Sequence, residues 1–283
     1  MTQRHAAIIA HSRRRLQQEI RRSGGAKNQL PTAAKAGILR AGHPGSRAAR
    51  ERPQEERSMK TKAAVRRIIE TLKELYPDAL CSLQYAKDYE LLFAVRLSAQ
   101  CTDARVNQVT PALFARFPTL ESLAQADPAE VGQYIRSCGF FNGKARDIVA
   151  CAQKLLAEHG GKVPGTMEEL TALPGVGRKT ANLILGDVFG QPAYVCDTHC
   201  IRITGRLGLT DGSRDPVQVE RQLRQVLPPE ESSDFCHRMV LFGRDVCTAR
   251  APKCEACPLQ GDCAQFQQGK KDEKSAKPRS GRK

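Results

Sequence analysis

The sequence has no apolar run long enough to cross a bilayer, although 40% of its 283 residues are hydrophobic. This excludes a membrane-spanning helix and still leaves enough apolar side chains for a sizeable core. The sequence also lacks any sustained alternation of apolar and polar residues between turn signals, which is the pattern of half-buried β-strands. Residues 59–267 are therefore predicted to be all-α.

The middle of the chain lacks the positive charge that the overall composition suggests. The net charge is +15, but residues 1–58 carry +9 and residues 268–283 carry +5, which leaves +1 for residues 59–267. The two basic ends favour an anionic partner. The middle can bind nucleic acid only through local geometry rather than through a general excess of charge.

The two basic ends have little apolar periodicity. Residues 1–58 are predicted to be a poorly ordered basic arm, either an Arg-rich targeting segment or an extension upstream of a natural start at Met59. Residues 268–283 are predicted to be a basic C-terminal tail. Both ends either add salt-dependent, sequence-independent affinity for DNA or are solvated segments without effect.

The eleven cysteines are an odd number for a disulfide framework. Seven lie scattered in apolar surroundings and are predicted to be small buried residues in a reducing compartment. These seven are Cys81, Cys101, Cys138, Cys151, Cys196, Cys200 and Cys236. The other four form a compact set with the spacing C-x6-C-x2-C-x5-C, at Cys247, Cys254, Cys257 and Cys263.

Four thiolates at this spacing predict a metal centre. Structural zinc sites usually pair two short Cys-x2-4-Cys segments, and here only one pair is that close. A cubane iron–sulfur cluster is compatible with the same four thiolates, and spacing alone leaves the choice open. Arg250 and Lys253 lie between the first two cysteines, where they could contact a phosphate or remain ordinary solvated surface.

Helix signals recur from Met59 onward. Asp127 followed by Pro128 predicts the start of a helix, and Thr166 with Glu169 predicts a capping box for a short helix that ends at Leu173. Apolar residues at helical spacing predict two further amphipathic helices, one stopped by Pro77 and one closed by Gly160-Gly161. Their apolar positions are Val65, Ile68, Ile69, Leu72, Leu75 and Tyr76 in the first helix, and Ala145, Ile148, Val149, Ala152, Leu155 and Leu156 in the second.

The stretch LPGVGRKTANLIL, residues 173–185, predicts a tight turn between two helices within residues 166–188. Pro174 discourages the first helix from continuing, and Gly175 and Gly177 are expected to allow positive φ and close backbone approach. The second helix then begins with exposed N–H groups that suit a phosphate. This arrangement is a helix-hairpin-helix, which holds one backbone phosphate without reading sequence. A P-loop needs a different glycine spacing and a Rossmann turn needs a preceding strand, and neither is present.

Lys179 has two interpretations. The predicted core stripe of its helix consists of Ala181, Ile184, Leu185 and Val188. Lys179 is expected on the opposite side, where Gly186 is expected to leave room. From this helix alone, Lys179 is best interpreted as a phosphate contact.

A second motif, VCDTH at residues 195–199, favours the other interpretation of Lys179, as a nucleophile. Asp197 precedes a helical run over residues 201–207 and has the position of an N-cap. It could instead face Lys179 as a base, because an amine attacks only when it is neutral. A carboxylate there would also stabilise a positively charged sugar intermediate.

LPGVGRKTA, VCDTH and the four-cysteine spacing, in that order, resemble the endonuclease III family of bifunctional DNA glycosylases and AP lyases, over roughly residues 59–266. The resemblance implies a [4Fe–4S] cluster on Cys247, Cys254, Cys257 and Cys263, and a catalytic pair of Lys179 and Asp197. It implies a two-lobed fold with the active site between the lobes. Residues 80–194 would form a six-helix barrel containing the hairpin, and residues 195–267 with the first helix, 59–79, would form the iron–sulfur domain.

Two further stretches carry the resemblance. LSAQCTD (97–103) resembles the segment whose glutamine, here Gln100, enters the gap left by an extruded nucleotide. GFFNGKA (139–145) resembles the loop that wedges into the duplex, with Phe140 where the family usually has leucine; without the family, Phe140 and Phe141 would be predicted to be a core pair. The DNA contacts implied are Gln100, Asp103, Phe140, Asn142, Gly175, Gly177, Arg178, Arg250 and Lys253.

The function implied is removal of oxidised pyrimidines from duplex DNA, followed by nicking of the abasic site through a Schiff base on Lys179. The expected partner is double-stranded DNA that contains damaged pyrimidines or abasic sites. The protein is expected to be a monomer and not to bind a membrane. The expected location is the nucleoid in a bacterial cytoplasm, with organellar or nuclear targeting by the arm left open.

Two other functions are weighed against this one. A non-catalytic helix-hairpin-helix protein would use the hairpin only to hold phosphate. An adenine glycosylase relative typically lacks the hairpin lysine, has Glu where Gln100 stands, and carries an additional C-terminal domain for which residues 268–283 leave no room. The sequence leaves lesion preference, opposite-base preference and any redox role of the cluster open.

Overall fold

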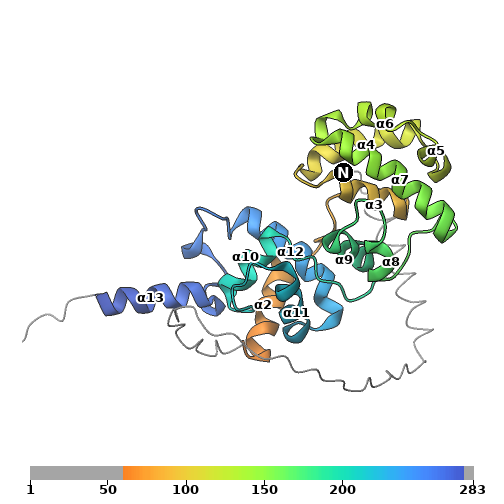
Figure 1. Cartoon of the computed structure of the whole chain (residues 1–283). Helices are drawn as coiled ribbons and strands as arrows, with labels where there is room; N and C mark the ends of the chain where they lie inside the picture. Colours follow the sequence, from red (N-terminus) through yellow and green to blue (C-terminus); the bar gives the residue numbers. More distant parts are fainter. Residues whose placement is uncertain (1–59, 277–283) are drawn as a thin grey trace, which may run out of the picture. The chain divides into compact units, whose positions relative to one another are not determined.

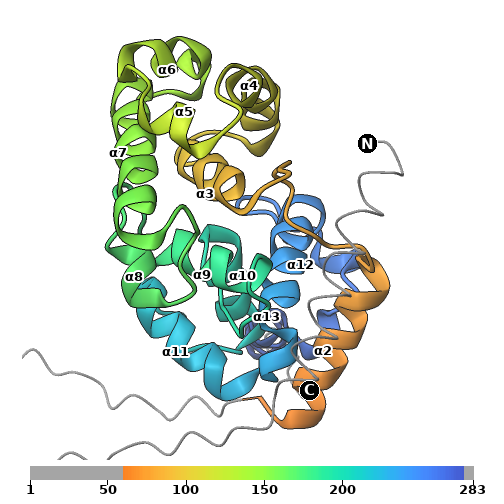
Figure 2. The same cartoon turned by 90° about the vertical axis from the view of Figure 1, so that its right-hand side faces the viewer.

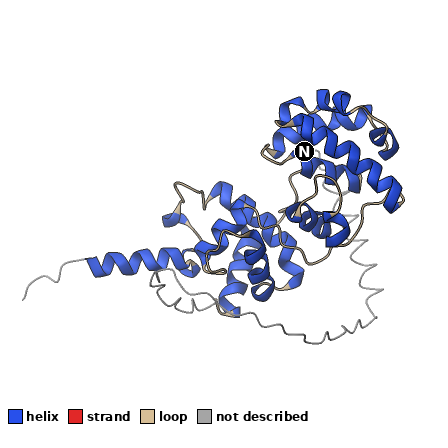
Figure 3. Cartoon of the chain, in the orientation of Figure 1, coloured by secondary structure: helices blue, strands red, loops and turns tan. Residues whose placement is uncertain are grey.

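Helices make up the regular structure of this chain. The computed structural model describes residues 60–276, with side chains described as far as Lys270. Every regular element within these residues is helical, and none is a strand (Figure 3). The predicted all-α class is therefore confirmed. The predicted basic arm over residues 1–58 and the end of the predicted tail, 277–283, lie outside the described residues.

The helices follow one another closely along the chain (Figure 1). The α-helices are α2 (Lys62–Leu75), α3 (Asp88–Leu97), α4 (Asp103–Arg116), α5 (Leu120–Ala124), α6 (Pro128–Tyr134), α7 (Phe141–His159), α8 (Met167–Thr171), α9 (Arg178–Asp187), α10 (Thr198–Leu207), α11 (Pro216–Val226), α12 (Ser232–Asp245) and α13 (Ala264–Ala276). Short 3-10 turns are η1 (Arg136–Cys138), η2 (Pro229–Glu231), η3 (Cys254–Ala256) and η4 (Gln260–Asp262).

Helix α2 ends just before Pro77, as its sequence predicts. The Thr61 side chain accepts a hydrogen bond from the backbone N–H of Ala64 at 3.3 Å, and the helix ends at Leu75, two residues before Pro77. Four of the six predicted apolar positions, Val65, Ile68, Ile69 and Leu72, are buried, whereas Leu75 is exposed. The helix packs against α12, beside which it lies in Figure 2. On its outer side, Arg67 makes a bidentate ion pair with Asp262, which ties α2 to the cysteine-rich segment.

Helices α3 to α9 form one packed group. The short helices α5 and α6 both lie against α7, while α3 packs on α4, α7 and α9. The longest element among the described residues is α7, which starts at Phe141, four residues before the predicted apolar stripe, and ends at His159. Gly160, which follows it, has a φ of 58°. That left-handed end is the one predicted from the paired glycines.

The predicted caps of α6 and α8 differ in outcome. Asp127 caps α6 by accepting from the Ala129 N–H at 2.9 Å, as predicted. Thr166 caps α8 by accepting from the Glu169 N–H at 3.2 Å, but the Glu169 carboxylate accepts from the Thr166 hydroxyl rather than from a backbone N–H. The predicted capping box is thus only half formed, and α8 ends at Thr171 instead of Leu173.

Helices α10, α12 and α13 pack together around the cysteine-rich segment. Helix α12 also contacts α9, and there the buried Asp187 carboxylate accepts from the Ser233 hydroxyl and pairs with the His237 ring. All described residues belong to one compact unit. The predicted tail from Gln268 begins inside α13. No helix among residues 60–276 is both long and apolar enough to span a membrane.

Candidate functional site

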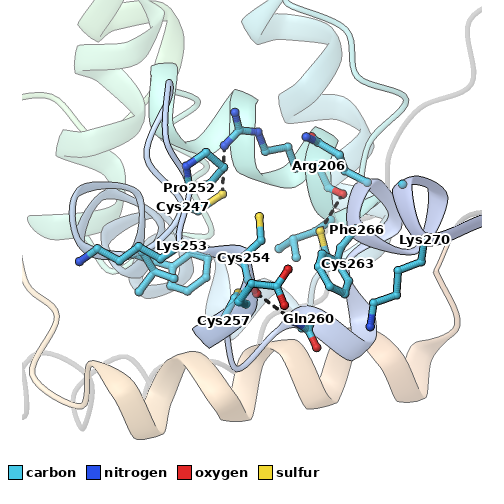
Figure 4. Close-up of a pocket in the computed structure, with 16 residues that line it drawn as sticks. Arg206, Cys247, Pro252, Lys253, Cys254, Cys257, Gln260, Cys263, Phe266 and Lys270 are labelled. Carbon is cyan, nitrogen blue, oxygen red and sulfur yellow. Dashed lines mark hydrogen bonds between the residues drawn. The ribbon is translucent and has the colours of Figure 1, made fainter. Parts of the chain in front are cut away.

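The four spaced cysteines surround a cavity of about 230 Å³ next to α10 and α12 (Figure 4). Cys247 follows α12, Cys254 and Cys257 flank η3, and Cys263 precedes α13. All four are half-buried. Burial, and then repulsion from the neighbouring thiols, raises the pKa of Cys254 and of Cys257 above the ordinary value.

The chemistry of this cavity fits an iron–sulfur cluster. Cys247, Cys254, Cys257 and Cys263 all line it. Four cysteine thiolates are the donor set that holds a cubane iron–sulfur cluster.

Arg206 holds the first cysteine of this set in place. It extends from α10 and donates to the Cys247 sulfur at 3.3 Å and to the carbonyls of Thr248 and Ala249 at 2.8 and 3.0 Å. The Cys263 thiol in turn donates to the Arg206 carbonyl at 3.4 Å. A cation here stabilises the negative charge of thiolates bound to a metal cluster.

The predicted hairpin lies between α8 and α9, and only one of its glycines has positive φ. Gly175 has a φ of 74°, and a Cβ there would lie 2.7 Å from Arg96 Nε and 2.8 Å from Asp147 Cβ. Gly177 instead has a φ of −97° and is the extended N-cap residue of α9, so its predicted positive φ is wrong. No described side chain caps α9 and no atom lies within 4 Å of a Gly177 Cβ position, so the backbone there is open to a phosphate.

Lys179 is exposed in the first turn of α9, as its place off the core stripe predicts. The predicted reason, a space left by Gly186 on that side of the helix, is nevertheless wrong. Gly186 leaves no room, because a Cβ there would lie 2.6 Å from the Ser233 hydroxyl, and Asn182 and Leu183 are buried as well. Residues 181–187 of helix α9 are all buried, whereas Lys179 in its first turn is exposed.

Asp197 and Lys179 act on the same imidazole. One Asp197 oxygen accepts from the Cys200 N–H at 2.7 Å, which caps α10, while the other has no described partner. Burial lowers the pKa of His199. The Asp197 carboxylate acts in the opposite direction, whereas the positive charges of Arg202 and Lys179 lower the pKa further. The lysine and the aspartate therefore lie in one electrostatic neighbourhood around His199, which favours the neutral ring.

A single arginine connects this neighbourhood to the cysteine set. Arg202 donates through one terminal nitrogen to His199 Nδ1 at 3.2 Å and to the Cys247 carbonyl at 3.0 Å. Since a guanidinium only donates, His199 Nδ1 accepts and the ring proton is on Nε2. Arg202, which is held by the Cys247 carbonyl, thereby fixes the tautomer of His199 beside Asp197.

Gln100 and Phe140 are the two non-glycine residues with positive φ among residues 60–276, at 54° and 47°. Both are exposed, and 76% of Phe140 is accessible to solvent. A core pair of Phe140 and Phe141 is thus excluded. An exposed phenylalanine in left-handed backbone is strained, and such strain persists only where surrounding structure imposes it.

Comparison with known proteins decides the family. A model of the HhH-GPD superfamily of base excision DNA repair proteins matches residues 93–229. A model of the iron-sulfur binding domain of endonuclease III matches residues 247–263. Endonuclease III from Synechocystis sp. is 47% identical over 201 residues, which cover 71% of this chain and 91% of that protein. The chain belongs to the endonuclease III family. Its cofactor is accordingly an iron–sulfur cluster held by the segment that contains the four cysteines.

Solved endonuclease III structures have the same fold. A non-covalent complex of endonuclease III with DNA and a trapped covalent endonuclease III–DNA intermediate each match with a TM-score of 0.70 and 41% identity. Each match covers 75% of this chain and all of the other. The predicted helix-hairpin-helix fold and the glycosylase and AP lyase activity of the family are thereby confirmed.

Two residues predicted from the endonuclease III resemblance to contact DNA are engaged within the protein. Arg178 makes a bidentate ion pair with the buried Glu220, at 2.7 and 3.0 Å. Asp103 accepts from the Ser82 hydroxyl at 2.5 Å and from Arg244 at 3.2 Å. The other predicted side chains, Asn142, Arg250 and Lys253, are exposed, and Lys253 points away from the four sulfurs in Figure 4.

Sequence reasoning missed several residues that shape this endonuclease III site. His199, Arg202 and Arg206 share one face of α10 at helical spacing. That polar stripe, next to the predicted aspartate, was a usable signal. Lys144 and Glu220 left no comparable signal, because their partners come from distant segments.

Gly243 gives His199 its space, and we expect Gly243→Ala to be costly. A Cβ at this position in α12 would overlap His199 Nδ1 and lie 3.0 Å from both Arg202 and the Ile203 side chain. Overpacking of this kind costs about 1–3 kcal/mol. Urea unfolding followed by helical circular dichroism measures it.

Gly143→Ala is the matched control. It lies in α7 with nothing within 4 Å of a Cβ, so alanine there should be neutral or stabilising. If Gly243→Ala unfolds at the same urea concentration as the wild type and keeps its activity, the close packing of α12 on His199 is wrong.

Glu220 anchors the start of α9, and Glu220→Gln should lower stability by about 2 kcal/mol at pH 7. Its carboxylate accepts from Arg178, Arg224 and Asn182, and its side chain is 3% exposed. Burial alone would raise the pKa of Glu220, but hydrogen bonds from the two arginines outweigh it and hold the pKa below 4.5. Its contribution is therefore complete above pH 4.5 and is lost as the pH falls through the lowered pKa.

Urea unfolding of both proteins at pH 7 and at pH 4 checks this. The difference between wild type and Glu220→Gln should shrink at the lower pH. A difference that grows with acidity would mean that the carboxylate does not act as the charged acceptor.

Proposed function

We propose that this chain removes oxidised pyrimidines from duplex DNA and then cuts the abasic strand through a Schiff base on Lys179. The Lys179 amine attacks C1′ of the deoxyribose and the base leaves, so that the C1′–N bond to the base is exchanged for a bond to the lysine. The ring opens to the iminium, loss of a C2′ proton follows, and the C3′–O bond to the phosphate breaks. The amine of Lys179 is exposed, has no partner among the described residues and lies beside the same His199 as Asp197, and this carries the proposal.

Asp197 has two roles in this scheme. One oxygen remains occupied by the cap of α10, and the other is left for the substrate. This second carboxylate oxygen of Asp197, which does not cap the helix, can take a proton from the attacking amine and stabilise positive charge on the sugar. The tautomer fixed by Arg202 keeps a neutral imidazole next to it, which avoids a second positive charge beside the amine.

DNA is held at several points in this proposal. The uncapped start of α9 at Gly177 takes a backbone phosphate, and Arg250 and Lys253 on the cysteine loop take another. Gln100 and Phe140 enter the helix where the damaged nucleotide turns out of the stack, at a cost of a few kcal/mol that damage reduces. In this proposal the protein acts as a monomer in a bacterial cytoplasm, in keeping with similar proteins from bacteria.

The cluster supports this arrangement without taking part in bond breaking. Its four cysteines fold the loop that carries Arg250 and Lys253, and Arg206 and Arg202 connect the same loop to α10. The bound cluster supplies a rigid, charged centre for that loop. Residues 80–194 supply the hairpin and the two inserting residues, while residues 195–267 and the first helix hold the cluster.

A duplex with one abasic site tests the function most simply. The purified protein should nick it and, with borohydride present, become covalently attached to it. A protein that binds the duplex but neither nicks nor attaches is a DNA-binding module, and the enzymatic proposal then fails.

A further inference from the structure

Lys144 is a buried cation without a carboxylate partner among the described residues. It lies in α7, and 1% of its surface is exposed. Its ammonium donates to three backbone carbonyls, those of Leu97 at 2.9 Å, Ala99 at 2.8 Å and Cys138 at 2.7 Å. All three donor protons are used, so the group is fully satisfied in a position where water cannot reach it.

The three carbonyls belong to the two segments that carry the strained residues. Leu97 is the last residue of α3 and Ala99 directly precedes Gln100, while Cys138 ends η1 two residues before Phe140. The backbone N–H of Lys144 also donates to the Phe140 carbonyl at 3.2 Å. The Lys144 side chain therefore holds the backbone directly before Gln100 and the backbone two residues before Phe140, while its own N–H contacts Phe140.

A merely space-filling role does not account for a lysine here. Methionine would fill the same volume without the cost of desolvating a charge, and burial does lower the pKa of Lys144. Methionine, however, has no hydrogen-bond donor for the carbonyls of Leu97, Ala99 and Cys138. These carbonyls lie where the backbone leaves α3 and η1. Those turns are the ones that place Gln100 and Phe140 in left-handed conformation on the surface.

We propose that Lys144 is a positioning residue that sets Gln100 and Phe140 jointly in the conformation that inserts into DNA. This rests on the proposed function, in which both residues replace the extruded nucleotide. Lys144 touches neither substrate nor the reacting atoms. It fixes two separate segments through one ammonium, so that both inserting side chains are ready before DNA arrives.

The test compares two substrates in Lys144→Met. Borohydride trapping on an abasic duplex requires insertion into the stack, whereas trapping on a single-stranded abasic oligonucleotide requires only the Lys179 amine. We expect the duplex rate to fall about a hundredfold, the scale for misplaced groups, and the single-strand rate to be unchanged. The matched control is Lys154→Met, which changes a surface lysine further along α7 that pairs with Glu158 and should alter neither rate.

A second readout reports insertion itself. 2-Aminopurine placed opposite the abasic site brightens when the stack is opened, and Lys144→Met should lose most of that signal at saturating protein. Gln100→Ala should reduce the signal in the wild type and add little in the Lys144→Met background, because the residue is already misplaced. If Lys144→Met does not fold, as judged by circular dichroism and cluster absorbance, Lys144→Gln takes its place in both measurements.

The outcomes separate the two proposals. Equal loss on both substrates, or full duplex activity and full fluorescence in a folded Lys144 variant, overturns the positioning role. Wild-type protein that traps neither substrate overturns the proposed function instead.

Discussion

Lys179→Gln should abolish strand nicking and borohydride trapping while damaged DNA is still bound. Removal of a covalent nucleophile typically costs roughly 10⁴-fold or more in rate. The exposed position of Lys179 and its lack of a described partner mean that glutamine should leave α9 intact. Gel-based nicking of an abasic duplex, with trapping in parallel, measures the loss.

Lys62→Gln is the control for this experiment. It removes another exposed lysine from the first turn of a helix, α2, and leaves the net charge equal to that of Lys179→Gln. Its nicking and trapping should match the wild type. A covalent adduct formed by Lys179→Gln at the normal rate would show that another amine is the nucleophile.

Asp197→Asn should slow turnover by about 10²- to 10⁴-fold, the range for general acid–base groups, with little change in DNA affinity. Asparagine caps helices about as well as aspartate, so the bond from the Cys200 N–H survives and stability should change little. The substitution thus removes the charge and keeps the cap. Single-turnover nicking and equilibrium binding, measured on the same abasic duplex, separate the two effects.

Asp197→Ser completes this test, because serine also caps well but has no carboxylate. Both variants should be equally slow and close to the wild type in melting temperature. If they instead nick at the normal rate and melt at a lower temperature, Asp197 is only the cap of α10.

Several helix boundaries that depend on local chemistry were predictable. Thr166, Asp127 and Asp197 cap the helices that they precede, and the glycine after α7 ends it in left-handed backbone. Caps act within three residues, so the sequence contains both partners. The spacing of the four cysteines likewise predicted that they would gather.

Predictions that needed a partner from elsewhere in the chain failed or were not made. Gly186 was expected to open a space, because a helical projection shows one helix without Ser233 of α12 against it. Lys144 resembles a surface lysine until the carbonyls that surround it are known. The positive φ of Phe140 has no sequence signal either, because phenylalanine does not favour that conformation.

Mapping the trapped adduct tests the nucleophile most directly. After reduction with borohydride on an abasic duplex, digestion with protease and nuclease leaves a sugar fragment on one peptide, which mass spectrometry can locate. The sugar should be found on Lys179, in the peptide that begins the second helix of the hairpin. A sugar on any other lysine, or on the amino terminus, would contradict the assignment.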